Sequence, residues 1–280
     1  MMKVAITGAN GYIGRHVVNA AIKAGHEVYA IDIDFKNVPN EAKRIEIDIF
    51  DHKSNVFQLM AKPDVLIHLA WRDGFIHNSE QHMKNLSDHV QFIRNYVKHG
   101  GKNVAVMGSM HEIGYHEGAI DENTPCNPLS QYGVAKNAMR QSLLLAAKEL
   151  NFNLYWLRAY YIFGDDRVGS SIFAKLTLAA DEGKKTFPFT TGKNKFDFIS
   201  VQELGKMIVA ASTQDKITGV INVSTGNPKS LAEQIEWYIK VHHWDIKLEY
   251  GAFPDRPYDS PAIWGDATKI QQIMGEVDGK

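Results

Sequence analysis

Tyr132 and Lys136, which stand four residues apart, are the side chains of this sequence best suited to acid–base chemistry. On a helix this spacing puts both side chains on one face. A phenol with a pKa near 10 is a poor catalyst at neutral pH, but a nearby ammonium favours the phenolate. Lowering the phenol pKa by ~3 units takes about 4 kcal/mol of differential stabilisation. We therefore expect Tyr132 to take a proton from a substrate hydroxyl, or to return one to a ketone, while Lys136 lowers its pKa.

Because a tyrosine–lysine pair at this spacing is common, its meaning depends on a third group, Ser109. This serine ends the predicted strand that begins at Asn103, and ligands of a doubly wound sheet bind beyond the carboxyl ends of its strands. Its hydroxyl can there hold the same substrate oxygen as Tyr132, whereas a plain turn serine is the alternative. His111 lies two residues further on and is a candidate for substrate contact. His68, which ends another strand, is expected to be a packed histidine.

Glycines at positions 8, 11 and 14 stand directly between an apolar strand and an amphipathic helix. In a dinucleotide-binding turn the first glycine allows the tight turn, the second lets a pyrophosphate approach the backbone, and the third lets the helix pack on the sheet. The helix N-terminus adds N–H groups and a partial positive charge. We expect the pyrophosphate of a cofactor at this loop, which comprises Gly8, Asn10, Gly11, Tyr12, Ile13 and Gly14.

Asp32 ends the second predicted strand and can accept hydrogen bonds from both ribose hydroxyls of an adenosine. A 2′-phosphate ~4 Å from this carboxylate would be repelled by several kcal/mol, so we expect NAD and not NADP. Arg15 is the nearby cation that could favour NADP, but a solvated helix position explains it better. Asp48, which ends the third strand, either hydrogen-bonds an adenine amino group or caps a turn.

These residues need a scaffold that brings the ends of several strands together. Short β-branched runs alternate with longer helical patterns, which implies parallel strands joined by crossover helices. The near-continuous apolar strands indicate a sheet covered on both faces. We predict an α/β fold, a Rossmann-type doubly wound parallel sheet with helices on both faces. The expected strands are Lys3–Thr7, Val28–Ile33, Arg44–Ile49, Asp64–Leu69, Asn103–Met107, Asn153–Leu157 and Gly219–Val223, and the helices are Tyr12–Ala24, Ser79–His99, Gln131–Leu150 and Val201–Ser212.

The second half of the chain is less regular. A strand-like Phe196–Ile199 lies among loops, and further helices are expected near Ser171–Glu182, Ser230–His243 and Asp266–Met274. We therefore predict an NAD-binding domain from residues 1–162 and 194–224, and a small discontinuous C-terminal substrate lobe from residues 163–193 and 225–280.

Composition excludes several classes of protein. The 280 residues carry 31 Lys and Arg against 32 Asp and Glu, a net charge of −1, which lacks the basic footprint of a nucleic-acid binder. The single cysteine, Cys126, can form neither an internal disulfide nor a cysteine-based zinc site, and we expect no metal. No apolar run approaches the ~18 residues of a membrane helix, and the start of the chain lacks a signal-peptide core of about 7–15 residues. We expect a cytoplasmic protein.

Together these residues resemble the extended short-chain dehydrogenase/reductases, and in particular the NAD-dependent epimerase/dehydratases that act on nucleotide sugars. The resemblance covers nearly the whole chain. Its most specific part is the glycine loop, Asp32, Asp48, His68-Leu-Ala, Asn85, Ser109 and Tyr132-x-x-x-Lys136, in the family's order and spacing. Later segments agree more loosely with the family's Arg-Asp-Phe-Ile-His-Val, Tyr-Asn-Val-Gly and closing Arg-Pro motifs: Asp197–Val201, Gly219–Ser224 and Arg256-Pro257 with Asp266 and Lys269.

The resemblance implies NAD at the glycine loop and a nucleotide sugar in a cleft under the smaller lobe. Tyr132 would be the acid–base residue, Lys136 its pKa modifier and a ribose ligand, and Ser109 the hydroxyl partner. The family commonly forms a homodimer through a helix bundle, which here implies the helices around Ser79–His99 and Gln131–Leu150. Further cofactor contacts are expected at Ile49, Leu69, Ala70, Trp71 and Asn85, and substrate contacts at Ser109, Met110, His111, Tyr161 and Arg256, the last on the nucleotide diphosphate.

Three departures from the family's pattern bear on the substrate. Tyr161 stands where the family often has asparagine and Phe196 where it has arginine, and both lost groups usually help to bind the diphosphate. The chain is also shorter than most members, and the shortfall falls in the substrate lobe. After Ser109, Met110 and His111 stand where a 4,6-dehydratase has its two acids, which disfavours dehydration.

Three functions stay open at this point. The first is an epimerase, in which bound NAD oxidises a sugar carbon, most readily C4, and hydride returns to the other face. The second is an NADH-dependent reductase of a 4-keto nucleotide sugar or another carbonyl. The third is a non-catalytic NAD-sensing protein, which is disfavoured because such proteins typically lose the equivalent of Tyr132 or Lys136.

Overall fold

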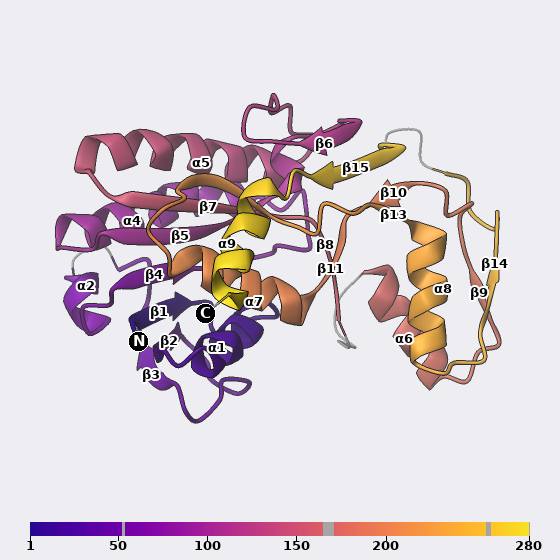
Figure 1. The fold of residues 1–280 in the computed structure, drawn as a ribbon, viewed down its shortest axis with the longest axis horizontal. Coiled ribbons are helices and arrows are strands. Elements are labelled where there is room, and N and C mark those ends of the chain that lie inside the picture. The colour runs from indigo at the N-terminus through magenta and orange to yellow at the C-terminus, as the bar shows by residue number, and fades with distance from the viewer. Residues whose placement is uncertain (52–53, 165–170, 256–258, 280) are drawn as a thin grey trace.

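The computed structural model describes residues 1–51, 54–164, 171–255 and 259–279, and its centre is a seven-stranded parallel sheet (Figure 1). The strand order β12-β7-β5-β4-β1-β2-β3 runs outward in both directions from β1 and β4, which confirms the predicted doubly wound sheet. The strands are β1 (Lys3–Thr7), β2 (Glu27–Asp32), β3 (Lys43–Glu46), β4 (Val65–His68), β5 (Asn103–Ser109), β7 (Asn153–Ala159) and β12 (Gly219–Val223).

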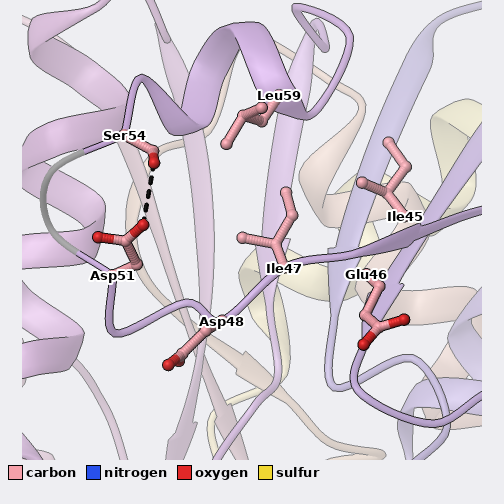
Figure 2. Close-up of a pocket in the computed structure, with 7 residues that line it drawn as sticks. All are labelled: Ile45, Glu46, Ile47, Asp48, Asp51, Ser54 and Leu59. Atoms are coloured by element: carbon pink, nitrogen blue, oxygen red, sulfur yellow. Dashed lines mark hydrogen bonds between the residues drawn. The ribbon is translucent and has the colours of Figure 1, made fainter.

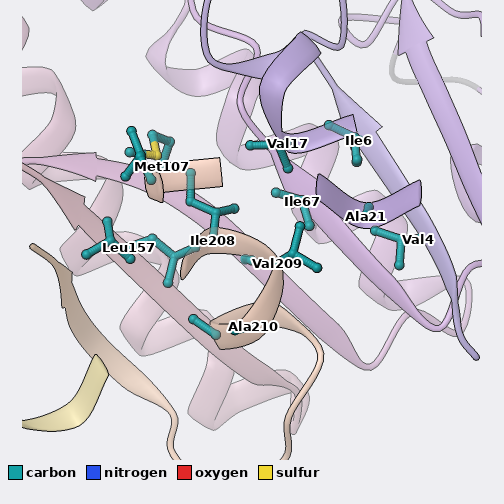
Figure 3. Close-up of a cluster of buried hydrophobic side chains, with 14 of the residues drawn as sticks. Val4, Ile6, Val17, Ala21, Ile67, Met107, Leu157, Ile208, Val209 and Ala210 are labelled. Atoms are coloured by element: carbon teal, nitrogen blue, oxygen red, sulfur yellow. The ribbon is translucent and has the colours of Figure 1, made fainter. Parts of the chain in front are cut away.

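Helices cover both faces of this sheet. On one face, α1 (Gly14–Lys23) and α7 (Val201–Ser212) contribute to one buried apolar cluster (Figure 3). Helix α9 (Thr268–Asp278) adds Ile270 and Ile273 to the same cluster. On the other, α2 (Val56–Leu59), α4 (Leu86–Lys98) and α5 (Gln131–Leu150) contribute to a second, with the short α3 (Gln81–Lys84) beside α4 and α5. In β1, Val4 and Ile6 belong to the first cluster and Ala5 to the second, which is why the strand is apolar throughout.

A smaller unit with its own apolar cluster adjoins the large sheet (Figure 1). It contains a four-stranded sheet of order β13-β10-β15-β6 and the two-stranded pairs β11-β8 and β14-β9. Its elements are η1 (Met110–Glu112), β6 (Gly118–Ile120), β8 (Tyr161–Phe163), α6 (Ile172–Asp181), β9 (Thr186–Pro188), β10 (Lys195–Phe196), β11 (Phe198–Ser200), β13 (Lys229–Ser230), α8 (Leu231–Val241), β14 (Lys247–Glu249) and β15 (Ala262–Gly265). None of the described helices is long and apolar enough to cross a membrane.

Two predicted strands are wrong in their extent, each because of an aspartate. The third strand ends at Glu46, since Asp48 lies in a turn in which its carboxylate accepts a hydrogen bond from the Phe50 N–H at 2.9 Å. The predicted strand Phe196–Ile199 is divided at Asp197 into β10 and β11, which pair in different sheets. The buried Asp197 carboxylate turns inward to accept several hydrogen bonds, which breaks the run.

The C-terminal helix does not follow the expected division of the chain. Ala267, Ile270 and Ile273 belong to the buried cluster that contains α1 and α7, so α9 packs on the large sheet although residues 225–280 were expected in the substrate lobe. Conversely, β6 and β10 come from ranges expected in the NAD-binding domain but pair in the smaller sheet. The smaller unit is therefore assembled from more segments than the sequence indicates.

Candidate active site

The start of helix α5 is fixed to the carboxyl edge of the large sheet. Ser130 caps the helix, and its hydroxyl accepts a hydrogen bond from the Gly133 N–H at 3.1 Å. The N–H of Tyr132 donates to the His77 carbonyl at 2.8 Å, in the loop of residues 71–80 that follows β4. Because first-turn N–H groups have no partner inside the helix, this bond ties the loop to the helix and sets the position of Tyr132.

The structure brings the hydroxyls of Ser109 and Tyr132 together. Strand β5 ends at Ser109, whose Oγ accepts a hydrogen bond from the His111 N–H at 3.3 Å and whose N–H donates to Glu112 Oε1 at 2.7 Å. This capping box holds the serine at the strand end. Hydrogen bonding with the Ser109 side chain lowers the pKa of the Tyr132 phenol, so the two hydroxyls are near enough to contact one substrate oxygen.

Glu112 is a site residue that the sequence reasoning missed. It is fully buried, and its carboxylate accepts from the Trp156 indole at 3.0 Å and pairs with Arg140 and Arg158 at 3.4 and 3.5 Å. Burial raises its pKa, and the Arg158 charge opposes the rise. An acid three residues after a strand-ending serine is the capping-box pattern, and that spacing is the signal that could have found it.

Lys136 lies on the same helix face as Tyr132 but is buried, at 3% exposure. Its Nζ donates to the Met107 carbonyl at 2.9 Å and lies 3.7 Å from the centroid of the Trp71 ring. Burial lowers the pKa of Lys136 to about 7, and the Glu112 carboxylate opposes that shift. The ammonium is therefore held by a carbonyl and an aromatic face.

The expected lowering of the Tyr132 pKa is wrong for this structure. Desolvation raises the pKa of the phenol to about 12, the hydrogen bond with Ser109 opposes the rise, and the Glu112 charge adds to it. Lys136 does not offset this rise, since its Nζ lies 5.8 Å from the Tyr132 ring centroid and nearer to Trp71. Four aromatic rings surround the phenol ring at centroid distances of 5.3 to 6.1 Å: His82, His77, His111 and Trp71.

The glycine loop has the shape that a dinucleotide requires. Gly8 has φ +67°, and a Cβ there would meet the Ala70 backbone N at 2.7 Å. A Cβ on Gly14 would meet the Gly8 carbonyl at 1.9 Å, so helix and loop are packed backbone to backbone. Helix α1 begins at Gly14, and Ile13 before it provides no side-chain cap. The fit to a pyrophosphate at this helix end is good on these contacts.

Asp32 and Asn10 organise the loop. The N–H of Asn10 donates to Asp32 Oδ2 at 2.9 Å, and the Ile33 N–H donates to Oδ1 at 2.8 Å. Asp32 is half-buried, and each carboxylate oxygen can accept a further bond from a ribose hydroxyl. The Asn10 side chain instead bonds within the protein, to Asp34 and to the Asn37 N–H.

Asn85 provides an independent sign of a ligand. Its amide Nδ2 is buried and has no hydrogen-bond partner in the described residues. Leaving a buried donor unsatisfied costs ~1–3 kcal/mol, so a bound group that accepts from it is favoured. The expected contacts Leu69 and Ala70 follow β4, where their N–H groups bond to Thr7 at 3.2 and 3.4 Å. These residues, with the glycine loop, fit a dinucleotide.

Asp48 lies apart from this arrangement. It is exposed and stands at the edge of a cavity of about 240 Å³, with Ile45, Ile47 and Leu59 forming the apolar wall (Figure 2). The described lining of the cavity contains no residue of the glycine loop or of α5. Its bond with the Phe50 N–H shows that Asp48 caps a turn, whereas the expected contact with an adenine amino group stays a prediction. Ile49, the next residue, is half-buried against the second apolar cluster.

The expected substrate contacts differ in their placement. Tyr161 and Phe196, the two departures from the family's pattern, pack on each other with ring centroids 4.2 Å apart. His111 is half-buried against His77, at 4.4 Å between ring centroids, next to Tyr132. Met110 is buried in the smaller unit's core, and Arg256 lies outside the described residues. No cluster of His, Cys, Asp or Glu that could hold a metal ion occurs among the residues described.

Comparison with known proteins agrees with this geometry. Over 269 residues, covering 94% of this chain and 99% of the relative, the sequence is 42% identical to a dTDP-6-deoxy-L-talose 4-dehydrogenase (NAD(+)) from Aggregatibacter actinomycetemcomitans. It is 25% identical to a UDP-glucose 4-epimerase from Lactobacillus helveticus, over 98% of this chain and 91% of the relative.

A solved structure has the same fold. The UDP-N-acetylglucosamine 4-epimerase from Methanobrevibacter ruminantium M1 superimposes with a TM-score of 0.84 at 22% identity, over 97% of this chain and 91% of that one. The family model described as the NAD dependent epimerase/dehydratase family matches residues 4–224. With the glycine loop, Ser109, Tyr132 and Lys136 in place, this chain belongs to the NAD dependent epimerase/dehydratase family.

Proposed function

We propose that this protein transfers hydride between NAD and C4 of a nucleotide-linked sugar, as a 4-dehydrogenase or, in the reverse direction, a 4-keto-sugar reductase. The observation that carries the proposal is the convergence of Ser109, Tyr132 and Lys136 at the carboxyl edge of the sheet. The near full-length similarity to a dTDP-sugar 4-dehydrogenase favours this net redox reaction. Epimerisation, supported by the weaker similarity to 4-epimerases, is the second candidate.

The glycine loop and Asp32 would hold NAD, with the Asn85 amide and Lys136 as further ligands. When bound, oxidised NAD supplies the hydride acceptor and a positive ring that favours the phenolate. Tyr132 takes the proton of the C4 hydroxyl as the C4–H bond breaks and its electron pair leaves as hydride. The Ser109 hydroxyl hydrogen-bonds the same oxygen, and the reverse steps reduce the ketone.

Dehydration is not part of the proposal. Met110 is buried in the core and His111 is an imidazole whose pKa is lowered to about 4 by burial, so neither supplies a carboxylate. Glu112 is enclosed by Arg140, Arg158 and the Trp156 indole. The substrate itself would lie between Tyr132 and the smaller unit, near Tyr161 and His111, where the aromatic pair of Tyr161 and Phe196 would replace polar contacts.

The test is direct. With NAD⁺ and dTDP-6-deoxy-L-talose, the purified protein is expected to form NADH. With NADH and the corresponding 4-keto sugar, it is expected to oxidise NADH to NAD⁺. Exchange between C4 epimers without net NADH formation would replace this proposal by the epimerase. Binding of NAD with no turnover of either kind would leave an NAD-sensing protein.

We further propose a homodimer formed through α4 and α5, and a cytoplasmic location. Leu145, Val134 and Met83 are 69%, 38% and 44% exposed on and beside α5, which suits a helix-bundle contact. Light scattering should give twice the chain mass, and Leu145→Glu should give the monomer. A monomeric parent protein would contradict the dimer, and recovery outside the cytoplasmic fraction would contradict the location.

A further inference from the structure

The buried ammonium of Lys136 has an unusual neighbour, the face of the Trp71 indole. The Nζ lies 3.7 Å from the ring centroid, and its other close partner is the Met107 carbonyl at 2.9 Å. In the part of the chain that the structure describes, no carboxylate is within ion-pair distance of Nζ. A desolvated cation over an indole face is stabilised by about 2 kcal/mol, so Trp71 takes the place that a counter-ion would otherwise fill.

The Trp71 ring is fixed in place by two histidines. Its Nε1–H donates to His82 Nδ1 at 3.1 Å. Because an indole nitrogen only donates, His82 Nδ1 is the acceptor, and its Nε2–H is left to donate to the Ile76 carbonyl at 2.9 Å. The indole also stacks on His89, with centroids 4.6 Å apart and planes 13° apart. The hydrogen bond and the stacking therefore hold the indole ring in place over Lys136.

The stack continues to the strand before the glycine loop. His89 hydrogen-bonds His68 at 2.9 Å, and His68 hydrogen-bonds the Thr7 hydroxyl at 2.8 Å. Burial lowers the pKa of both histidines, so both are neutral at pH 7. Trp71 is therefore connected to β1, β4 and α4 without any charged group between them.

The charges near Lys136 come from few elements. Glu112, in the turn after β5, favours the ammonium; His68 on β4 and His89 on α4 are neutral; and Tyr132 is its neighbour on α5. Arg72, after β4, acts on His89. Burial is the dominant influence and lowers the pKa of Lys136 to about 7. The indole face and Glu112 are thus the groups that favour the charged form.

We infer that Trp71 is a positioning residue of this active site: its indole face favours the ammonium form of Lys136 beside Tyr132 and directs one N–H away from the ring. An ammonium has three N–H donors. One is used by the Met107 carbonyl and one faces the indole, which leaves the third for the Tyr132 oxygen or a ribose hydroxyl. The inference rests on the proposed function only in the effect of Lys136 on Tyr132.

The test varies the indole face and keeps its shape. Tryptophans with one, two and three ring fluorines, incorporated at position 71, lose negative potential on the face step by step. The pKa of Lys136 is followed by NMR of its ¹⁵Nζ in lysine-labelled protein, without substrate or turnover. We expect the pKa to fall with each fluorine, by about one unit in total. The same series at Trp237, exposed on α8, is the control and should leave the pKa unchanged.

An unchanged Lys136 pKa across the Trp71 series would overturn the inference. A second readout is kinetic. Because neutral Lys136 favours the Tyr132 phenolate less than the ammonium does, the pH at which kcat for sugar oxidation is half-maximal should rise across the same series, while KM stays constant. If no sugar is turned over, the NMR series still decides the role of Trp71. If sugars are turned over but the fluorines have no effect on either readout, this inference alone fails and the proposed function stands.

Discussion

Although Tyr132 and Lys136 share a helix face, the ammonium lies nearer to Trp71 than to the phenol. Spacing on a helix could predict that both side chains project together, but it could not predict what else shares the space. Trp71 comes from the loop after β4, and only tertiary packing places it on Lys136. In this structure the Ser109 hydroxyl, and not Lys136, is the group that lowers the pKa of the Tyr132 phenol.

Replacement of Tyr132 by phenylalanine removes the proton acceptor. Loss of general acid–base catalysis typically costs 10²–10⁴-fold, so Tyr132→Phe should lower kcat by about that factor and keep NAD binding. Single-turnover NADH formation measures the effect. Tyr115→Phe is the control, because Tyr115 is exposed and bonded to Glu117. A Tyr132→Phe enzyme within threefold of the parent would remove Tyr132 from the mechanism.

Asp32 should determine the choice between NAD and NADP. Asp32→Asn keeps an oxygen that can accept the Asn10 N–H but removes the negative charge. Because ~1.4 kcal/mol changes affinity tenfold, loss of the repulsion should raise the relative affinity for NADP⁺ at least tenfold. Calorimetric titration with both cofactors measures the ratio. Asp48→Asn should leave the affinities for both cofactors unchanged if Asp48 only caps a turn, whereas a weaker NAD affinity in that variant would support the adenine contact.

The buried Lys136 should make stability depend on pH in a definite direction. Its pKa is lowered from 10.5 to about 7 on folding, so between these values the unfolded chain binds more protons than the native protein. The free energy of unfolding then rises with pH in this window, by about 1.4 kcal/mol per unit. Urea unfolding at pH 7 and pH 9 should show this rise in the parent and a smaller one in Lys136→Met. Equal slopes would contradict the lowered pKa.

At the scale of elements, long segments with local signals were predictable and short ones were not. Helix α5 runs from Gln131 to Leu150 as predicted, because Ser130 caps its start and Asn151 adopts the left-handed conformation at its end. The strands of two or three residues around Asp197 have no such signal. They are separated because the buried Asp197 carboxylate accepts hydrogen bonds from N–H groups at two distant places in the chain, Thr225 with Gly226 and Gly265.

Asp197 should therefore hold several elements together at once. Its carboxylate accepts from Thr225 and Gly226 after β12 and from Gly265 at the end of β15. In Asp197→Asn an amide NH₂ would face donors that it cannot satisfy, and bonds to a charged acceptor are worth ~1.5–3 kcal/mol each. We expect the free energy of unfolding to fall by about 3 kcal/mol in urea titration. Asp255 is exposed and bonds to Thr191, so Asp255→Asn should lower the free energy of unfolding by much less. Equal losses would contradict the role of Asp197 as the acceptor that holds these elements together.

On the scale of the whole molecule, the doubly wound sheet followed from the alternation of strands and helices, but the outline of the smaller unit did not. Its sheet combines β6, β10, β13 and β15, which are distant in sequence and too short for any pattern to pair them. The return of α9 to the large sheet rests on Ile270 and Ile273, two residues of an ordinary amphipathic helix. The site is easier to predict than its surroundings because strand ends and a glycine loop carry local signals.

The large sheet and the glycine loop should act as one unit in cofactor binding. Gly8→Ala introduces a Cβ at φ +67° and 2.7 Å from the Ala70 backbone, so the loop must move away from β4. Gly25→Ala is the matched control, since Gly25 has φ +78° but nothing within 4 Å of a Cβ. In both variants the strained backbone should lower the free energy of unfolding by ~1 kcal/mol. In Gly8→Ala the close contact with Ala70 should lower it further.

Addition of NAD⁺ then separates the two effects. A ligand at 100 times its Kd stabilises a protein by ~2.7 kcal/mol, which should appear as a rise in Tm in the parent and in Gly25→Ala. Gly8→Ala should show little or no rise, because a displaced loop no longer presents its backbone to the pyrophosphate. An equal rise in both variants would mean that the close packing of Gly8 on Ala70 serves the stability of the sheet and not the binding of the cofactor.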